Sequence, residues 1–495
     1  MRNRVEVPSV VLVVVAFAAL LPWAGAFAAG PPADKGQRTA EMPMRVQTEG
    51  TTYGQYLQRQ ADLMTRLRGS VPAAAMHAPV RVDLSREEID GVERAPRVNG
   101  MPQRIGLVKG VNPMLAVDGV QIDSAPGGPR RGPGAQASRT ADGGLAWAVE
   151  VSAAGAGALR VHLEGLSLPA SAELYFYSRA GEVFGPYRGA GPDGDGDLWT
   201  DTVFGAEGIL ELHVAAGASP ADLQLVAFRV TEVGIVMPRF AGSFTPAAVG
   251  FCGDPDCIVD ATCVTGTAAD AAKDAVAKME WAQGQFLYTC TGGLIADSNP
   301  AQDNFFLTAA HCLGNNKTAR NLQFYWRFRT SSCNGTCPIN TGWPYKTMGS
   351  TVASTGKKGD YTLLHLDAVP PANSVFLGWT NVAVALANGT HLYRISNPDF
   401  GPQVYSQHDV DTAAGTCGGW PRGGWIYSRD IMGAIDGGSS GSPIINGASQ
   451  IVGQLSGTCG GNPSDACSSG PGEANATVDG AFAGYYSSIQ PIINP

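Results

Sequence analysis

The ten cysteines of this 495-residue chain all lie in its second half, from Cys252 onward. An even number of cysteines in an exported chain indicates disulfide bonds, and these require the loops that they join to lie close in space. A zinc site at Cys333 and Cys337 is the competing interpretation, but no histidine pair or second CxxC pair accompanies them. We therefore expect disulfides after residue 251, a different kind of structure before it, and neither a metal nor a cofactor.

The N-terminus has the three parts of a secretory signal peptide. Arg2 and Arg4 form a basic start, an apolar run follows, and Ala26-Phe27-Ala28 supplies an A-x-A cleavage signal. A membrane anchor is the alternative, but the apolar core is short and no charged stop-transfer cluster follows it. We expect residues 1–28 to be removed, the product to be secreted, extracellular or periplasmic, and no membrane span to remain.

Composition favours turn-rich β structure, because the chain has 64 glycines, 33 prolines and only 16% charged residues. Its net charge of −9 argues against nucleic acid as a partner.

Within residues 145–245, "LRVHLEGL" alternates apolar and polar side chains and predicts a half-buried strand, and several similar short segments follow. These predict a β-sandwich-like domain at 145–245, after a partly helical or irregular segment at 29–144 and before a third domain at 246–495.

Three motifs in the last domain carry residues of the kind that hydrolases use. "FFLTAAHC" contains His311, "KKGDYTLLHLD" contains Asp360, and "GGSSGSPI" contains Ser439, Ser440 and Ser442. A serine hydroxyl needs a base such as histidine to take its proton, and a buried carboxylate fixes the tautomer of that histidine. Backbone N–H groups must then stabilise the developing oxyanion. Together the motifs predict nucleophilic catalysis by a serine.

The order of the motifs along the chain separates two classes of hydrolase. "GGSSG" also matches the nucleophile elbow of α/β-hydrolases, centred on Ser439, but there the histidine follows the serine. No histidine of this chain lies after His408, so the elbow interpretation and with it an esterase are disfavoured. His-Asp-Ser is the chymotrypsin-like order.

"FLTAAHC", "DYTLLHL", "GSSGSPI" and "IVGQLSG", with "CIVDATC", "TCTGGLI" and "TVDGAFAGYYSSI", resemble the chymotrypsin-fold serine endopeptidases, most closely the secreted bacterial lysyl-endopeptidase group. The resemblance covers about residues 252–495, and the β-rich block resembles, more weakly, the prosequence of such precursors. It implies a mostly β fold: a double six-stranded antiparallel β-barrel for catalysis, preceded by the β-sandwich-like pro-domain. It also implies a monomeric zymogen that cleaves polypeptides, with its own prosegment acting as intramolecular chaperone or inhibitor.

The resemblance assigns roles by position. His311 is the general base, Asp360 its orienting acid and Ser440 the nucleophile, with the N–H groups of Gly438 and Ser440 as the oxyanion hole. It also implies the disulfides Cys290–Cys312, Cys263–Cys333 and Cys257–Cys467, and it leaves the pairing of Cys252, Cys337, Cys417 and Cys459 open. Ser439 stands where animal relatives carry an aspartate that pairs with the freed N-terminus, so we expect another mode of activation.

The same resemblance suggests the walls of the pocket that selects the residue before the cut bond. They would be Ala434, Ser456 and a position near Thr477. Asp479 would face the same way as Thr477 in a strand and could select Lys or Arg from the base of the pocket; the alternative is a turn aspartate outside it.

For the chain as a whole, the alternative function is a catalytically inactive, protease-like binding protein.

Overall fold

The computed structural model of the protein describes residues 39–70, 76–95, 98–122, 135–241, 252, 255–337 and 344–495. All of them belong to one unit, Arg38–Pro495. The predicted signal peptide lies outside the described residues, as does most of the segment 242–254 around the predicted third boundary. No helix of the described part of the chain is long and apolar enough to cross a membrane.

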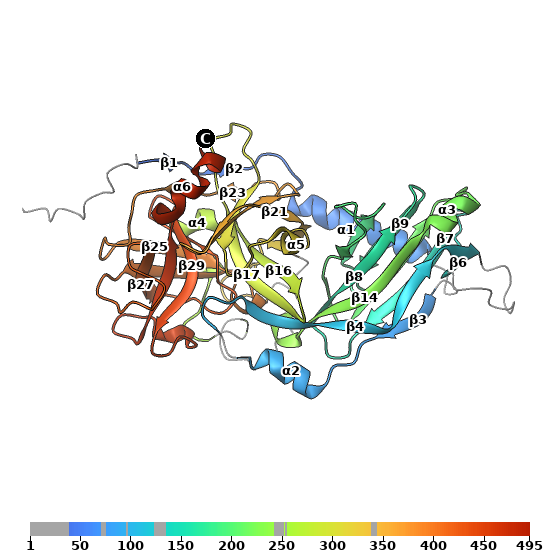
Figure 1. The fold of residues 1–495 in the computed structure, drawn as a ribbon, viewed down its shortest axis with the longest axis horizontal. Helices are drawn as coiled ribbons and strands as arrows, with labels where there is room; N and C mark the ends of the chain where they lie inside the picture. Colours follow the sequence, from blue (N-terminus) through green and yellow to red (C-terminus); the bar gives the residue numbers. More distant parts are fainter. Residues whose placement is uncertain are drawn as a thin grey trace, which may run out of the picture. The chain divides into compact units, whose positions relative to one another are not determined.

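The N-terminal part of the unit forms two packed sheets (Figure 1). One sheet has the order β10-β9-β13-β7-β6-β5, with β3 beside β7. Its strands are β3 (Met76–Arg81), β5 (Val120–Ile122), β6 (Ala135–Arg139), β7 (Leu145–Ser152), β9 (Ala172–Tyr177), β10 (Val183–Tyr187) and β13 (Glu207–Val214). The facing strands are β4 (Gln103–Asp118), β8 (Ala158–Ser167), β11 (Leu198–Trp199), β12 (Val203–Phe204) and β14 (Ala227–Val236). Valines and leucines of both layers share one core, as a sandwich requires.

The predicted boundary at residue 145 divides strands that the structure joins. The long strand β4 lies in the segment that was expected to be helical or irregular, and yet it pairs with β14 over most of its length. The helical expectation for that segment holds for α1 (Tyr53–Ser70) and α2 (Arg86–Glu93), while α3 (Pro220–Leu225) lies within the sandwich. Helix α2 begins at a capping box, in which Ser85 and Glu88 each bond the other's backbone N–H.

The C-terminal part contains the expected mostly-β, chymotrypsin-like pair of barrels. A closed barrel is made by β25 (His391–Ser396), β26 (Val404–Val410), β27 (Trp425–Met432), β30 (Asn475–Ala481), β29 (Gln450–Gly460) and β28 (Pro443–Ile445), which pairs back with β25. A half-barrel is made by β16 (Val276–Gln283), β17 (Phe286–Leu294), β18 (Phe305–Ala309), β19 (Gln323–Trp326), β20 (Tyr345–Met348), β21 (Ser350–Gly356) and β22 (Tyr361–Leu366).

Short elements complete the C-terminal part. They are β15 (Val259–Asp260), α4 (Ala269–Ala272), α5 (Asn316–Ala319), β24 (Gly378–Thr380), which pairs with β1 (Glu41–Met42), and β23 (Val375–Phe376), which pairs with β2 (Arg45–Val46). The C-terminal helix α6 (Phe482–Ile493) packs Phe482, Tyr485 and Tyr486 into the core beside Trp379.

The sandwich and the half-barrel share one sheet, because β4 pairs with β17. Gln103 lies opposite Thr289, and Leu107 lies opposite Phe286. This contact changes the environment of "LRVHLEGL" as well. The strand is present as β8, but Arg160 on its polar face is fully buried, because it faces Glu280 of β16 at 3.7 Å. The prediction of a half-buried strand therefore fails for Arg160 and His162 on that face, while Glu164 is exposed as predicted.

Candidate active site

His311 and Asp360 are brought together by the pairing of β18 with β22. Ala309 at the end of β18 lies opposite Tyr361 at the start of β22, so the residues just beyond this pair are neighbours. His311 Nδ1 lies 2.7 Å from Asp360 Oδ2, and the backbone N–H of His311 donates to Asp360 Oδ1 at 2.9 Å. Both side chains are about nine-tenths buried, at 9% and 11% exposure. One carboxylate therefore fixes both the ring and the loop of His311, as an orienting acid must.

Ser440 lies in the turn before β28, and its carbonyl oxygen lies 3.7 Å from Sγ of Cys312, the residue that follows His311. The same carbonyl accepts from Thr291 N at 2.8 Å, and the next residue, Gly441, donates to Leu455 O. Gly441 has φ of 82°, and an added Cβ there would lie 2.2 Å from Thr308 Oγ1, so only glycine fits. The turn is thereby held between the two barrels.

Two sets of polar groups around Ser440 have no partner among the described residues. His311 Nε2 is buried and makes no hydrogen bond there, to Ser440 Oγ or to any other atom. The N–H groups of Gly438 and Ser440 likewise have no acceptor in the part of the chain that the structure describes. Gly438 has φ of 91°, and its carbonyl is turned away to accept from Thr291 Oγ1 at 2.8 Å. These groups are those that a bound carbonyl and its attacking hydroxyl would use.

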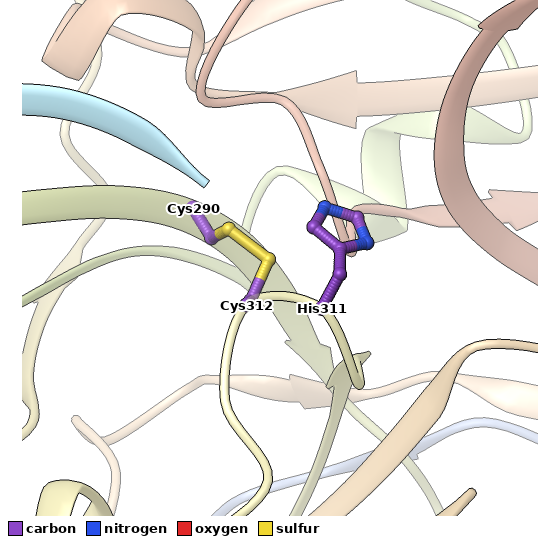
Figure 2. Close-up of side chains that lie close together, drawn as sticks. All are labelled: Cys290, His311 and Cys312. Carbon is purple, nitrogen blue, oxygen red and sulfur yellow. A yellow bond between two sulfur atoms is a disulfide. The ribbon is translucent and has the colours of Figure 1, made fainter. Parts of the chain in front are cut away.

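All ten cysteines are paired. The three pairs that the resemblance implies, Cys290–Cys312, Cys263–Cys333 and Cys257–Cys467, are disulfides in the structure. The open pairing resolves as Cys252–Cys337 and Cys417–Cys459. Figure 2 shows the ring of His311 beside the disulfide of Cys290 and Cys312. Their donor atoms lie within 4.8 Å of one another, but disulfide sulfurs lack the thiolate charge that a zinc ligand needs.

Gln454 is a site residue that the sequence analysis missed. It lies on β29, and its Nε2 donates to Asp360 O at 3.0 Å and to Gly359 O at 2.7 Å. Its Oε1 accepts from the buried hydroxyl of Tyr485 on α6. Asp360 needs this support because its φ of 51° lies in the left-handed region. The motif "IVGQLSG" contains Gln454, but nothing in the motif indicated its role.

Ser439 is fully buried, and its Oγ donates to Ser396 Oγ at 3.0 Å. It also accepts from the N–H of Asp436 at 3.3 Å. Neutral hydroxyl contacts therefore fill the place where animal relatives form an ion pair. That the N-terminal ammonium switch does not operate here stays a prediction.

The prediction for Asp479 is wrong. Its side chain is fully buried and bonds the guanidinium of Arg394 at 2.5 Å, beneath the nucleophile turn. Arg394 also donates to the carbonyl of Ser442 at 2.9 Å and so connects Asp479 to the end of the nucleophile turn. Asp479 thus supports the turn that carries Ser440 and lies outside the pocket.

Of the other three predicted pocket residues, Ser456 lines the pocket next to Ser440. Ala434 packs instead against Ile258 and Val404. Thr477 donates to Asp430 Oδ1 at 2.7 Å inside the barrel. The segment of Ala434 does reach the pocket, through its neighbour Ile435, whereas no residue of β30 is among the described lining residues.

The pocket next to Ser440 is lined on one side by residues of the N-terminal part. The lining residues are Val98, Asn99, Gly100, Met101 and Gln103 from that part, and Ile435, Asp436, Gly437, Ser440, Leu455, Ser456, Gly457, Thr458, Pro463 and Ala466 from the C-terminal part. The space left between them is about 50 Å³. Since ligand pockets usually measure about 300–1,000 Å³, little room remains while these residues are present.

Comparison with known proteins identifies the family. A family model described as "Lysyl endopeptidase, C-terminal domain" matches residues 253–471, and one described as "Lysyl endopeptidase N-terminal domain" matches residues 136–231. A lysyl endopeptidase of Pseudomonas aeruginosa is 32% identical over 378 residues, which cover 72% of this chain and 77% of that protein. The chain belongs to the lysyl endopeptidase family. It is a serine endopeptidase.

Solved structures similar to this chain are more distant. The active form of the Rv3671c protease from M. tuberculosis is 18% identical, covers 48% of this chain and 88% of its own, and superposes with a TM-score of 0.31. The HtrA-type protease AlgW with a tripeptide is 15% identical, covers 46% of this chain and 62% of its own, and superposes with a TM-score of 0.33. The assignment to the lysyl endopeptidase family therefore rests on the sequence matches.

Proposed function

We propose that this chain is the secreted precursor of an endopeptidase in which His311, Asp360 and Ser440 form the catalytic triad. The observation that carries the proposal is the double contact of one buried carboxylate with the ring and backbone of His311, next to the turn of Ser440. The inactive alternative is disfavoured because all three residues are present in this arrangement.

The chemistry follows from these atoms. Asp360 holds the proton of His311 on Nδ1, which leaves Nε2 free to take the proton of Ser440 Oγ. The alkoxide attacks the substrate carbonyl, and the N–H groups of Gly438 and Ser440 bind the oxyanion of the tetrahedral intermediate. His311 then protonates the leaving amine, and water attacks the acyl-enzyme by the same route. The substrate is a polypeptide cut after Lys or Arg.

Export is part of the proposal. The basic start, apolar run and A-x-A signal of residues 1–28 support removal of a signal peptide. The five disulfides support an extracellular or periplasmic protein, because disulfides persist in oxidising compartments.

The N-terminal part inhibits the enzyme until it is removed. Asn99 supports this role, because its side chain bonds both the carbonyl and the N–H of Thr458, the latter at 3.1 Å. The side-chain amide of Asn99 thus pairs with the backbone carbonyl and N–H of Thr458, where β29 lines the pocket. Beyond it, Gln103 and Arg104 add a strand to β17, which covers another edge of the site.

A fluorophosphonate probe tests the proposal. Ser440 should be labelled in the matured enzyme, with mass spectrometry locating the adduct, and His311→Ala should abolish labelling. His365→Ala is the matched control, since it removes an exposed histidine from β22, the strand that follows Asp360. Absence of adduct in the wild-type enzyme, or an adduct that persists in His311→Ala, contradicts the proposal. A digest of a denatured protein, read by mass spectrometry, then gives the residue before each cut bond.

A further inference from the structure

Residues 397–401 form a loop, here called the 397–401 loop, that packs against the turn before Ser440 and has a strained backbone. Asp399 has φ of 45° and Phe400 has φ of 63°. Both angles lie in the left-handed region, which is unfavourable for residues other than glycine. Two such residues in succession persist only where the surrounding contacts hold them in place. The shape of this loop is therefore set by its partners.

The loop fixes the direction of one proposed oxyanion donor. The N–H of Asp399 donates to the carbonyl of Gly437 at 2.6 Å. That carbonyl and the N–H of Gly438 belong to the same trans peptide bond, which is planar and points its C=O and N–H in opposite directions. The bond from Asp399 thus holds the N–H of Gly438 pointing away from the loop, ready for an oxyanion.

The next peptide of the turn is tied to the same loop. The carbonyl of Gly438 accepts from Thr291 Oγ1 at 2.8 Å, and Thr291 Oγ1 in turn accepts from the backbone N–H of Asn397 at 3.1 Å. Both peptide planes that meet at Gly438 are therefore linked to the 397–401 loop. A shift of the loop would rotate these planes and turn the donor away from the substrate.

Lys278 anchors the strained part of the loop. Its side chain is fully buried, and its Nζ donates to the carbonyl of Phe400 at 2.8 Å. The rings of Tyr325, Phe328 and Phe400 surround Nζ, with centroids at 4.4, 3.6 and 3.4 Å. Burial lowers the pKa of Lys278, but an amine and an ammonium can both donate this hydrogen bond.

The two anchors of the loop stand side by side in the half-barrel. Lys278 on β16 lies directly opposite Thr291 on β17, so both side chains project from one face of the sheet. Both residues belong to the C-terminal part and would remain after the proposed maturation. Arg239, which lies 3.1 Å from the carboxylate of Asp399, belongs to the N-terminal part and would not.

We propose that Lys278 is a positioning residue for the oxyanion hole. Through the carbonyl of Phe400 it holds the 397–401 loop, and the loop fixes the peptide that carries the N–H of Gly438. This inference rests on the proposed function and deepens it. Lys278 acts through the loop and does not touch the substrate, so its effect is confined to states in which the substrate oxygen carries negative charge.

The test uses the full chain, exported and matured, with Lys278→Met, which keeps the length of the side chain and removes its donor. The probe is a peptide aldehyde with a basic C-terminal residue. Ser440 Oγ forms a bond to the aldehyde carbon, its proton passes to His311, and the aldehyde oxygen becomes an oxyanion. The corresponding peptide alcohol has no carbonyl and binds without this step. It therefore reports substrate binding alone.

The expected effect is selective for the aldehyde. Since removal of one oxyanion donor costs about 10²–10³-fold in kcat, we expect Lys278→Met to weaken aldehyde binding and lower kcat by at least about tenfold and at most about 10³-fold. The affinity for the alcohol and the KM for a peptide substrate should change by less than about twofold, because these report ground-state binding. A general loosening of the fold would weaken both inhibitors together.

Lys317→Met is the matched control, because it makes the same substitution at an exposed lysine of α5, and both inhibitors should keep their affinity. Unchanged aldehyde affinity in Lys278→Met, or an equal loss for aldehyde and alcohol, overturns the assignment. If Lys278→Met does not mature, Thr291→Val decides, since it removes the hydroxyl that joins Gly438 to Asn397: unchanged aldehyde affinity there overturns the role of the loop. A wild-type enzyme that binds the aldehyde no more tightly than the alcohol overturns the proposed function instead.

Discussion

Replacing Asn99 by alanine should open the pocket of the precursor. The side chain makes three hydrogen bonds to Thr458: one to its carbonyl, one from its N–H at 3.1 Å and one from its hydroxyl at 3.2 Å. Each bond contributes about 0.5–1.5 kcal/mol net, so their loss weakens the closed state by about 1.5–4.5 kcal/mol. The groups on Thr458 regain water, so no additional penalty for an unpaired buried group applies. Conversion at about 1.4 kcal/mol per tenfold gives roughly 10- to 10³-fold.

The assay is carried out in a Ser440→Ala background, so that the full chain cannot process itself through that serine. A fluorescent lysine peptide competes with the N-terminal segment for the pocket, and its apparent Kd falls by the factor above in Asn99→Ala. Gln103→Ala is the matched control, because Gln103 lines the same pocket but its side chain, among the described residues, bonds only the adjacent carbonyl of Arg104. We expect less than a twofold change there. Equal affinity of the peptide for Asn99→Ala and the parent would refute inhibition through Asn99.

Three further predictions concern catalysis and stability. Asp360→Asn should lower kcat about 10⁴-fold by favouring the wrong tautomer of His311, measured by steady-state cleavage of a lysine peptide; a loss below tenfold contradicts its role. Arg394→Met leaves Asp479 buried without its partner and should lower the free energy of unfolding by about 3–5 kcal/mol in urea titrations. A neutral outcome there would show that the pair is dispensable. Replacing Cys257 and Cys467 by serine should cost about 2–5 kcal/mol in the same assay, since that disulfide spans 210 residues; an unchanged midpoint would argue against the pairing.

The sequence predicted the parts of the site that lie in short continuous motifs. His311 follows the apolar strand β18 and Asp360 precedes the apolar strand β22, and their motifs predicted that both belong to the candidate site. The glycines around Ser440 identified the turn. These features are local, because the residues that shape each segment are its neighbours in the chain. The order of the motifs along the chain then indicated the class of hydrolase.

The predictions that failed depend on partners distant in sequence. Alternation along a strand placed Thr477 and Asp479 on one face, but which cavity that face meets depends on β29, whose register with β30 shifts between Leu455 and Gly457. The guanidinium that binds Asp479 belongs to Arg394, which is 85 residues away in the sequence. Asn99 meets Thr458 across 359 residues. No pattern within either segment indicates such a partner.

The contact between the sandwich and the half-barrel explains why "LRVHLEGL" was predicted correctly as a strand but with the wrong exposure for Arg160. Charged groups from both parts are buried against each other there: Lys346 Nζ lies 2.5 Å from Glu182 Oε1, and both side chains have no exposure. Burial raises the pKa of Glu182, while the nearby Lys346 opposes that rise. A permanently joined core would gain stability if such pairs were replaced by apolar side chains, because burying ions costs free energy. Charged residues at this contact are instead suited to two parts that must each face water after separation, as the proposed maturation requires. The same reasoning applies to β17, whose edge at Phe286–Thr289 is paired with β4 and, in the proposed maturation, becomes available when β4 leaves.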